Sequence, residues 1–323
     1  MSKQKTLTGT IRLLVAIPCL NEAATIAQVV QDVPRTILGV DHVDVLVVDD
    51  GSSDDTSSEA ANAGALVLHH PRNFGVGKAF QTAINYAVEN GYDLMVNIDG
   101  DGQFNPQDIP KLVQPVIANK ADMVTASRFI NVDMIPDMSK VKLVGNHMMS
   151  YLISRLVRQN FHDVSCGFRC YSRESLLQLN LHGAFTYTQE TFLDFAVKRL
   201  TIMEVPIPVV YFADRKSRVA GSISKYAVNT AKIIFRGYRD YFPLRFFWGI
   251  ALAFAIPAVI LAVLFFGHYL VSGVFTGYLF AGFLSAFFTI MATVFIVLGI
   301  VADMLDRIRS NQERILYRLK KRG

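Results

Sequence analysis

The feature that most constrains this sequence is a long uncharged segment near its C-terminus. From Phe246 to Ala302 the chain contains no Asp, Glu, Lys or Arg. Within it, Phe246–Gly267 and Tyr278–Ala302 would each form an α-helix of about 33 Å or more, enough to cross the hydrocarbon core of a bilayer. The stretch between them, from His268 to Gly277, contains Ser and Gly and is typical of a turn. The segment predicts two transmembrane helices in a hairpin; a helix pair buried in a soluble protein is the alternative.

Basic residues flank this hairpin on both sides but are absent from its turn. Arg236, Arg239 and Arg245 precede it, and the 303–323 tail has seven basic and three acidic residues. By the positive-inside rule, the body of the chain and both termini are expected in the cytoplasm, at the plasma membrane if the cell is prokaryotic. The polar segment from Met1 to Arg12 predicts no signal peptide, which agrees with that orientation.

Two amphipathic segments lie beside the predicted spans. Residues 224–245 mix Lys and Arg with Tyr, Phe and Ile, a composition typical of helices at the headgroup level. Residues 303–323 repeat apolar side chains at helical spacing and predict a basic cytosolic tail helix, which could lie on lipid or pack against a second copy of the chain. A homo-oligomer therefore stays open. Most of the net charge of +5 belongs to this tail, which argues against a nucleic-acid partner.

Residues 1–223 alternate short apolar runs with helix-like stretches. This alternation predicts a cytosolic α/β domain with a parallel sheet covered by helices on both faces. The predicted strands are Ile11–Ile17, Val43–Val48, Ala65–Leu68, Leu94–Ile98 and Met123–Ala126. The predicted helices are Glu22–Val33, Asp55–Ala63, Gly77–Glu89 and Pro106–Ala118.

Polar and acidic residues follow three of these strands. They are Asn21 and Glu22 after the first strand, Asp49 and Asp50 after the second, and Asp99 and Asp101 after the fourth. Ligands of parallel sheets bind at the carboxyl ends of the strands. Two carboxylates one residue apart, beside glycines, suit a magnesium ion that must also hold phosphates. No GxGxxG follows the first strand, and residues 74–79 match a phosphate-binding loop poorly, so dinucleotide and P-loop chemistry are disfavoured.

Seven segments together resemble glycosyltransferase family 2, and their order resembles its dolichyl- or polyprenyl-phosphate sugar synthases. They are VAIPCLNE (15–22), VVDDGSSDDT (47–56), NFGVGKA (73–79), DGDGQFNP (99–106), ASRF (126–129), DVSCGFR (163–169) and RVAGSISKY (218–226). The resemblance implies a GT-A fold, a Rossmann-like nucleotide-sugar-binding domain, with Mg²⁺ or Mn²⁺ as cofactor. With two C-terminal spans, it also implies a nucleotide-sugar donor and a polyprenyl-phosphate acceptor in the membrane.

The resemblance also implies roles for individual residues. The residues implied to bind the nucleotide-sugar donor are Pro18, Asn21, Glu22, Asp49, Asp50, Lys78 and Asp99. The metal ligands are Asp99, Asp101 and Gln103, and the catalytic set is Asp101, Arg128, Arg215, Arg218 and Lys225. The last three, with Ser224, match a loop near the bilayer that helps to close the site; the loop is one residue longer here than in the commonest form. Glu190 matches an acceptor-side acid, and Gln189 is expected on a helix surface.

The implied chemistry is consistent with these residue types. A phosphate monoester has a second pKa of about 6 and is a ready nucleophile that needs no strong general base. It needs positive charge to approach an anionic donor, and a metal to stabilise the departing diphosphate. In-line attack would invert the anomeric centre, so we expect inverting transfer of a sugar to a polyprenyl phosphate at the cytoplasmic face.

Two other functions are weighed against this one. A processive polysaccharide synthase would carry QxxRW, but the only Trp is Trp248, inside the first predicted span. A non-catalytic nucleotide-sugar-binding scaffold would not need Asp101, Arg128 and Lys225 together. The sequence does not distinguish UDP from GDP donors, one sugar from another, or undecaprenyl from dolichyl acceptors.

Overall fold

The computed structural model describes residues 9–131, 135, 138, 140–180, 187–210, 232, 235–240 and 242–322. The chain divides into two compact units, each described here by itself. The first comprises Met1–Ala231 together with Leu316–Gly323, and the second is Lys232–Ile315.

The first unit is built on one seven-stranded sheet. Its strands are β1 (Arg12–Cys19), β2 (His42–Asp49), β3 (Leu66–His69), β4 (Leu94–Asn97), β5 (Met123–Ser127), β6 (Arg169–Ser172) and β7 (Ile202–Pro206). They lie in the order β3-β2-β1-β4-β6-β5-β7. The chain runs outward from β1 through β2 to β3 and then returns to place β4 on the other side of β1. A switch of direction of this kind opens a crevice at the carboxyl ends of the strands, where α/β proteins bind ligands.

The sheet is mixed, so the expectation of a parallel sheet is wrong for one strand. β6 pairs antiparallel with both β4 and β5, whereas β2, β1 and β4, and likewise β5 and β7, are parallel. No sequence signal predicted β6, because its four residues RCYS include a charged side chain and no apolar run. Arg169 is nevertheless fully buried.

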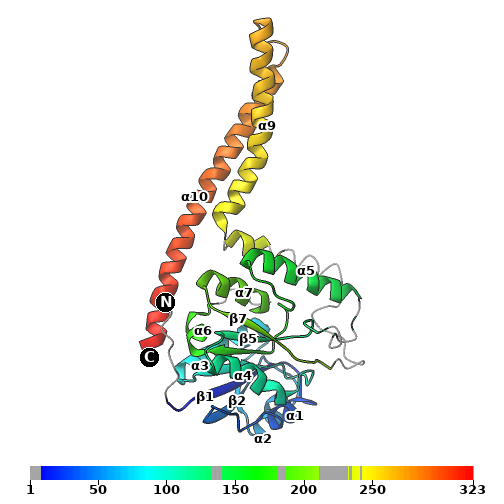
Figure 1. Ribbon diagram of the computed structural model, residues 1–323, viewed down its shortest axis with the longest axis vertical. Coiled ribbons are helices and arrows are strands. Elements are labelled where there is room, and N and C mark those ends of the chain that lie inside the picture. Colours follow the sequence, from blue (N-terminus) through cyan, green and yellow to red (C-terminus); the bar gives the residue numbers. More distant parts are fainter. Residues whose placement is uncertain are drawn as a thin grey trace. The chain divides into compact units, whose positions relative to one another are not determined.

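Helices cover both faces of the sheet (Figure 1). One face packs against α1 (Ile26–Gln31) and α4 (Ile109–Ile117), the latter preceded by the 3-10 turn η1 (Pro106–Asp108). Alternate residues of β1 share this apolar core with Ile26, Val30, Leu112 and Val113. The predicted helix at Glu22–Val33 begins later than expected, because Asn21 adopts a positive φ of 52° and residues 23–25 form turns.

The opposite face packs against α3 (Val76–Glu89), α6 (Arg173–Gln178) and α7 (Tyr187–Lys198). Phe80 of α3 joins the two sides of this layer: its ring lies 5.6 Å from that of Tyr171 on β6 and 4.1 Å from that of Tyr187 on α7. Two further helices complete the unit, α2 (Thr56–Asn62) beside β3 and α5 (Lys140–Val157) beside α7.

The loop after β2 depends on a glycine. Gly51 has φ +79°, and a Cβ built on it would lie 2.5 Å from the carbonyl carbon of Arg72. The backbone that follows β3 therefore packs directly on the backbone that follows β2. No other residue type permits both the positive φ and this close approach.

The second unit contains a hairpin of two apolar helices (Figure 1). They are α9 (Pro243–Ser272) and α10 (Leu279–Arg322), and both are long and apolar enough to cross a membrane. α9 ends at Gly273, which adopts φ +72° and caps the helix by donating to the carbonyl of Tyr269. The predicted turn at 268–277 is thereby shifted, because α9 extends into it as far as Ser272 whereas α10 begins only at Leu279.

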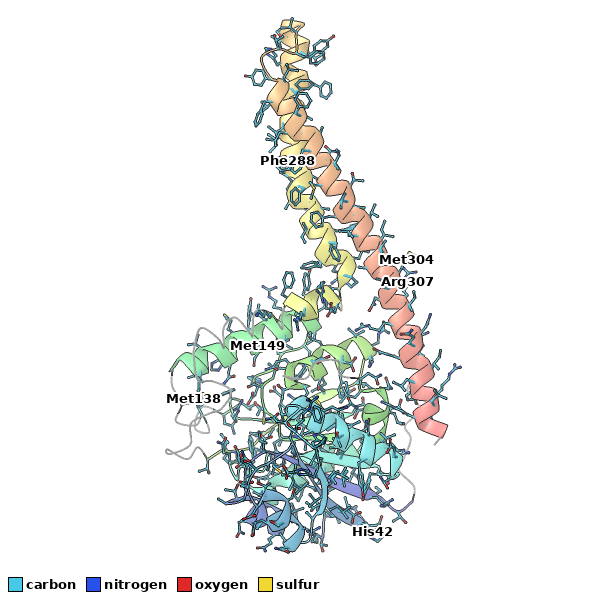
Figure 2. The ribbon with its side chains drawn as sticks, turned by 180° about the vertical axis from the view of Figure 1, so that it is seen from behind. His42, Met138, Met149, Phe288, Met304 and Arg307 are labelled. Atoms are coloured by element: carbon cyan, nitrogen blue, oxygen red, sulfur yellow. The ribbon has the colours of Figure 1, made fainter. Side chains whose placement is uncertain are left out.

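Small residues let the two helices of the hairpin approach closely. The Ser285 hydroxyl donates to the carbonyl of Ala258 at 2.9 Å, and a Cβ on Gly282 would lie 2.9 Å from the ring of Phe265. Phe254 packs between Phe288 and Phe295 of α10. Most other large apolar side chains of the two helices project outward along the length of the hairpin, as Figure 2 shows around Phe288. In lipid, close packing and hydrogen bonding of this kind hold helices together.

The predicted tail helix is not a separate element. α10 continues from the apolar segment to Arg322 without a break. Of the predicted interfacial segment 224–245, residues 232, 235–240 and 242–245 are described; those from 235 to 240 are helical, and α9 already begins at Pro243.

Gly51 provides a first test of this packing. Gly51→Ala should lower the free energy of unfolding by clearly more than the about 1–2 kcal/mol that a left-handed alanine costs, because its methyl group also collides with the Arg72 backbone. Gly64→Ala is the matched control: Gly64 has φ +90° but open space around the same position. Denaturant unfolding of the full chain in detergent would measure both, and equal losses would contradict the proposed close contact.

Candidate active site

Three of the predicted polar clusters meet at one edge of the sheet. β2, β1 and β4 are neighbours and run parallel, with Cys19 paired to Asp49 and Ala16 paired to Asn97. Their carboxyl ends therefore lie side by side. The loops that follow carry the polar residues predicted from the sequence.

The loops after β1 and β2 are bonded to each other. The backbone N–H of Asn21 donates to the Ser52 hydroxyl at 2.8 Å, and the Asn21 side chain accepts from the backbone N–H of Ser53 at 2.8 Å. The N–H of Glu22 donates to the Thr56 hydroxyl at 2.8 Å. Pro18 is buried at the end of β1. These bonds fix the backbone of both loops and leave the Asn21 side chain exposed at their surface.

Asp49 is a buried carboxylate at the end of β2. One oxygen accepts from the backbone N–H of Ser52 at 2.9 Å; the other accepts from the Ser57 hydroxyl and lies 3.1 Å from Nδ1 of His69. Burial alone would raise the pKa of Asp49, but these hydrogen bonds outweigh it and hold the pKa below its ordinary value. Asp49 is therefore ionised and anchors the loop after its own strand.

Asp50 holds the loop that follows β3. Its carboxylate accepts from the backbone N–H groups of Phe74 at 3.0 Å and Gly75 at 2.7 Å, and lies 2.7 Å from Nδ1 of His70. Gly75 in turn precedes the first turn of α3, where Lys78 is exposed. Asp50 thus positions the helix that presents Lys78, a structural task that the sequence pattern did not reveal.

Asp99 and Asp101 follow β4, beside the crevice between β1 and β4. Within the part of the chain that the structure describes, the Asp99 carboxylate accepts no hydrogen bond and forms no ion pair. Burial and the negative charge of Asp101 raise the pKa of Asp99 to about 7, and burial also raises that of Asp101. One oxygen of Asp101 accepts from the backbone N–H of Gln103 at 3.1 Å.

This donor set fits a divalent cation. Burial disfavours ionisation of both carboxylates, and the charge of Asp101 disfavours that of Asp99 further. A bound cation would stabilise both charged forms, and the Gln103 side chain offers an amide oxygen. Among the described residues there is no cluster of three or more His, Cys, Asp or Glu side chains that would form a complete protein cage. Sites of one or two carboxylates leave coordination positions open, as a metal that binds phosphates requires.

Arg128 lies at the end of β5 and is held by a buried acid. Its Nε donates to Asp163 Oδ2 at 2.6 Å and its guanidinium Nη2 to Asp163 Oδ1 at 2.9 Å; Nη2 also donates to the Ser165 hydroxyl at 2.7 Å. Asp163 is fully buried, and its backbone N–H donates to Glu204 of β7 at 2.8 Å. Burial opposes ionisation of Asp163, but Arg128 outweighs it and lowers the pKa. The planar, bidentate pair fixes the direction of the arginine.

The residues that bind Arg128 lie in a segment that the sequence analysis had already singled out. Asp163 and Ser165 belong to the DVSCGFR segment, but no role for either residue followed from the pattern alone. Glu204 had no such signal, since it lies in a strand that the sequence analysis did not predict.

The remaining predicted residues divide into two groups. Gln189, expected on a helix surface, is buried in α7, where its side chain accepts from the Thr188 hydroxyl; that expectation was wrong. Glu190 is half-buried on the same helix. Arg215, Arg218, Ser224 and Lys225 lie outside the described residues.

Comparison with known proteins agrees with this fold. The family model described as glycosyl transferase family 2 matches residues 14–179. The chain is 31% identical over 215 residues to the UDP-N-acetylglucosamine–dolichyl-phosphate N-acetylglucosaminyltransferase of Methanococcus voltae, an alignment that covers 60% of this chain and 84% of that protein. It is 29% identical over 244 residues to the undecaprenyl-phosphate mannosyltransferase of Micrococcus luteus, covering 68% and 91% of the two chains.

Solved structures show the same architecture. Glucosyl-3-phosphoglycerate synthase from Mycobacterium tuberculosis, crystallised with Mn²⁺, UDP-glucose and phosphoglyceric acid, superimposes with a TM-score of 0.55 at 23% identity. The superposition covers 69% of this chain and 79% of that one, which establishes a shared fold. The fold, the motifs and the match of the family model over half of the sequence lead to one conclusion: the chain belongs to glycosyl transferase family 2 and is a glycosyltransferase.

Proposed function

We propose that this enzyme transfers a sugar, with inversion, from a nucleotide-sugar donor to a polyprenyl phosphate at the cytoplasmic face of the membrane. The observation that carries the proposal is the Asp99 carboxylate. It has no partner within the described residues and lies beside Asp101 at the crevice of the sheet, in a chain that also has two apolar helices. The two relatives named for lipid-phosphate acceptors support the same acceptor class.

The nucleotide-sugar donor would bind over the carboxyl ends of β1, β2 and β4. Pro18, Asn21 and Glu22 would line the nucleoside pocket, with Asp49 and Asp50 behind it. Exposed Lys78, on the first turn of α3, adds positive charge for the donor phosphates. The structural neighbour that holds UDP-glucose with Mn²⁺ supports donor binding on this fold.

Asp99, Asp101 and Gln103 would hold a divalent cation, Mg²⁺ or Mn²⁺. When bound, such an ion stabilises the negative charge that develops on the departing diphosphate. The carboxylates fit that role because each is destabilised by burial, and Asp99 also by the charge of Asp101.

The acceptor phosphate needs positive charge more than it needs a base. Its second pKa of about 6 leaves it largely ionised near neutral pH. Arg128 would supply a fixed positive charge from the end of β5, since Asp163 and Ser165 set its direction. We assign Arg215, Arg218 and Lys225 to a loop that closes over both phosphates and excludes water.

The membrane arrangement is part of the proposal. α9 and the apolar part of α10 would cross the bilayer, with residues 1–223 forming the cytosolic catalytic domain and 224–245 an interfacial segment. The basic 303–323 segment would stay on the cytoplasmic side, because Lys and Arg are retained there.

The metal assignment is tested by removing one charge. Asp101→Asn should lower the rate of sugar transfer by at least tenfold, a barrier increase of about 1.4 kcal/mol or more. EDTA should inhibit the native enzyme, and added Mg²⁺ or Mn²⁺ should restore it. Asp93→Asn is the matched control, because Asp93 immediately precedes β4, at its opposite end, and contacts the backbone of Arg12. Transfer at more than a tenth of the native rate by Asp101→Asn would contradict the assignment.

The Arg128–Asp163 pair predicts a combined effect on stability and acceptor use. Asp163→Asn should lower the free energy of unfolding by about 3 kcal/mol, because it leaves a mostly buried guanidinium without its counter-charge. The pKa of Asp163 is depressed in the folded state, so its contribution is present above about pH 4 and is lost as the pH falls through the folded pKa. The difference between native and variant stabilities should shrink over that acidic range.

Activity separates a purely structural pair from one that orients Arg128. Asp163→Asn should also lower kcat/KM for the lipid phosphate, measured where the variant is folded, while the KM for the donor stays close to native. Ser165→Ala removes one neutral partner of Arg128 and should cost only about 1 kcal/mol of stability. Equal losses in kcat/KM for both substrates would contradict the acceptor-side role.

Topology is tested by site-directed labelling. Tags at Met1 and Gly323 should both be cytoplasmic, and Ser272→Cys should react with an impermeant maleimide only from the opposite face. The native thiols give a low background, because Cys19, Cys166 and Cys170 are all buried. Ser58→Cys, exposed on α2, is the cytoplasmic control. Labelling of position 272 from the cytoplasmic side would contradict the two-span arrangement.

A further inference from the structure

A buried polar cluster lies directly behind Asp99. Asn97, the last residue of β4, is fully buried and its side chain points to the face covered by α3 and α7. Its amide nitrogen donates to the carbonyl of Gly167 at 2.9 Å and to the hydroxyl of Tyr187 at 3.0 Å. These three residues come from three different segments, and the proposed mechanism has not used any of them.

The direction of these hydrogen bonds follows from chemistry. A backbone carbonyl can only accept, so the atom of Asn97 that faces Gly167 must be the NH₂ group. The same nitrogen has a second hydrogen, which it donates to the Tyr187 oxygen. The Tyr187 oxygen therefore accepts from Asn97, and the proton of the hydroxyl is left for another acceptor.

The Tyr187 side chain is held rigidly. It is 3% exposed, and its ring stacks on that of Phe80 with centroids 4.1 Å apart and an angle of 23° between the planes. A phenol has an ordinary pKa of about 10, so the hydroxyl keeps its proton near neutral pH. A rigid, protonated hydroxyl is a hydrogen-bond donor in a fixed position.

Asp99 lies on the same side of this cluster. Residues two apart at a strand end face the same side of a sheet, which places Asp99 with Asn97. A Cβ built on Gly167 would lie 2.9 Å from the Tyr187 oxygen and 3.3 Å from both carboxylate oxygens of Asp99. The two groups thus line the same small space above Gly167, and only the absence of a side chain there lets both approach it.

We infer that Tyr187, fixed by Asn97, is a positioning residue that orients the Asp99 carboxylate for the divalent cation. The inference rests on the proposed role of Asp99 as a metal ligand. Tyr187 and Asp99 are close but are not hydrogen-bonded among the described residues. The hydroxyl would donate to the carboxylate once Asp99 turns to hold the ion, and it would then restrict the rotation of that carboxylate. Gly167 is the third member, because its missing side chain leaves room for both groups to approach each other.

The alternative is that Tyr187 only anchors the start of α7 to the sheet. In that case its hydroxyl stabilises the fold through Asn97 and has no effect on the ion. The two roles differ in one measurable quantity, the affinity of the protein for the cation in the absence of substrates.

The test is a Mn²⁺ titration of the full chain in detergent, followed by electron paramagnetic resonance of the free ion. Tyr187→Phe keeps the stacked ring and removes the hydroxyl; it should weaken Mn²⁺ binding by about tenfold or more, the usual effect of losing a partner of a metal ligand. Tyr171→Phe is the matched control. Tyr171 is also fully buried against Phe80, and within the described residues its hydroxyl has no hydrogen-bond partner. It should bind Mn²⁺ like the native protein.

Thermal unfolding with and without Mn²⁺ gives a second readout. Ligand binding raises the melting temperature once the ligand concentration reaches its Kd. At a Mn²⁺ concentration near the native Kd, Tyr187→Phe should therefore lose most of the Mn²⁺-dependent rise and Tyr171→Phe should keep it. Gly167→Ala should behave like Tyr187→Phe, because its methyl group must displace either Tyr187 or Asp99.

The outcomes separate a failure of this inference from a failure of the metal assignment. Native Mn²⁺ affinity in Tyr187→Phe would overturn the inference and leave the metal site intact. If that variant does not fold, native Mn²⁺ affinity in Gly167→Ala would overturn it instead. If neither the native protein nor Tyr187→Phe binds Mn²⁺, the metal assignment and this inference are both overturned.

Discussion

The parallel pairing of β2, β1 and β4 is the constraint on which the rest of the candidate site depends. Their register brings three strand ends, far apart in the sequence, to one edge of the sheet. The loops that leave those ends then bond to one another: Asn21 to Ser52 and Ser53, and Thr25 to the carbonyl of Gly100 at 2.8 Å. The position of each loop therefore follows from the sheet and needs no long side chain to hold it.

Acidic side chains at this edge serve two different purposes. Asp49, Asp50 and Asp163 each accept several hydrogen bonds from the protein. These bonds hold loops or an arginine in place. Asp99 is different, since it has no such partner within the described residues and burial raises its pKa. Burial of a carboxylate is costly, and the charges of Arg128 and Arg169 offset that cost only in part. In the proposed function, a bound divalent cation offsets the rest of this cost.

The two units solve different problems of solvation. In the first, the apolar faces of the sheet are buried under helices. In the second, α9 and α10 keep large apolar side chains exposed along most of their length and bury mainly small residues between them. Exposed Val, Leu, Ile and Phe at this density are unfavourable in water and favourable in lipid, which gives the hairpin its physical explanation.

Much of the fold could be predicted from the sequence because its signals are local. Apolar runs marked the five strands β1 to β5, and the charge-free segment marked both long helices. Adjacent carboxylates with glycines marked the proposed metal site, and the family motifs marked Arg128. The strand β6 could not be predicted, because a four-residue strand with a buried arginine has no periodic signal.

The sequence by itself determined which residues carry charge at the strand ends and which segment is suited to lipid, since both depend on composition along the chain. Only the tertiary structure decided how those charges are used. It paired Arg128 with Asp163, tied Asp50 to the loop before α3, and placed Tyr187 and Asn97 behind Asp99. Each of these contacts joins residues 24 to 90 positions apart. Contacts at such separations depend on strand order and register, which no local pattern encodes.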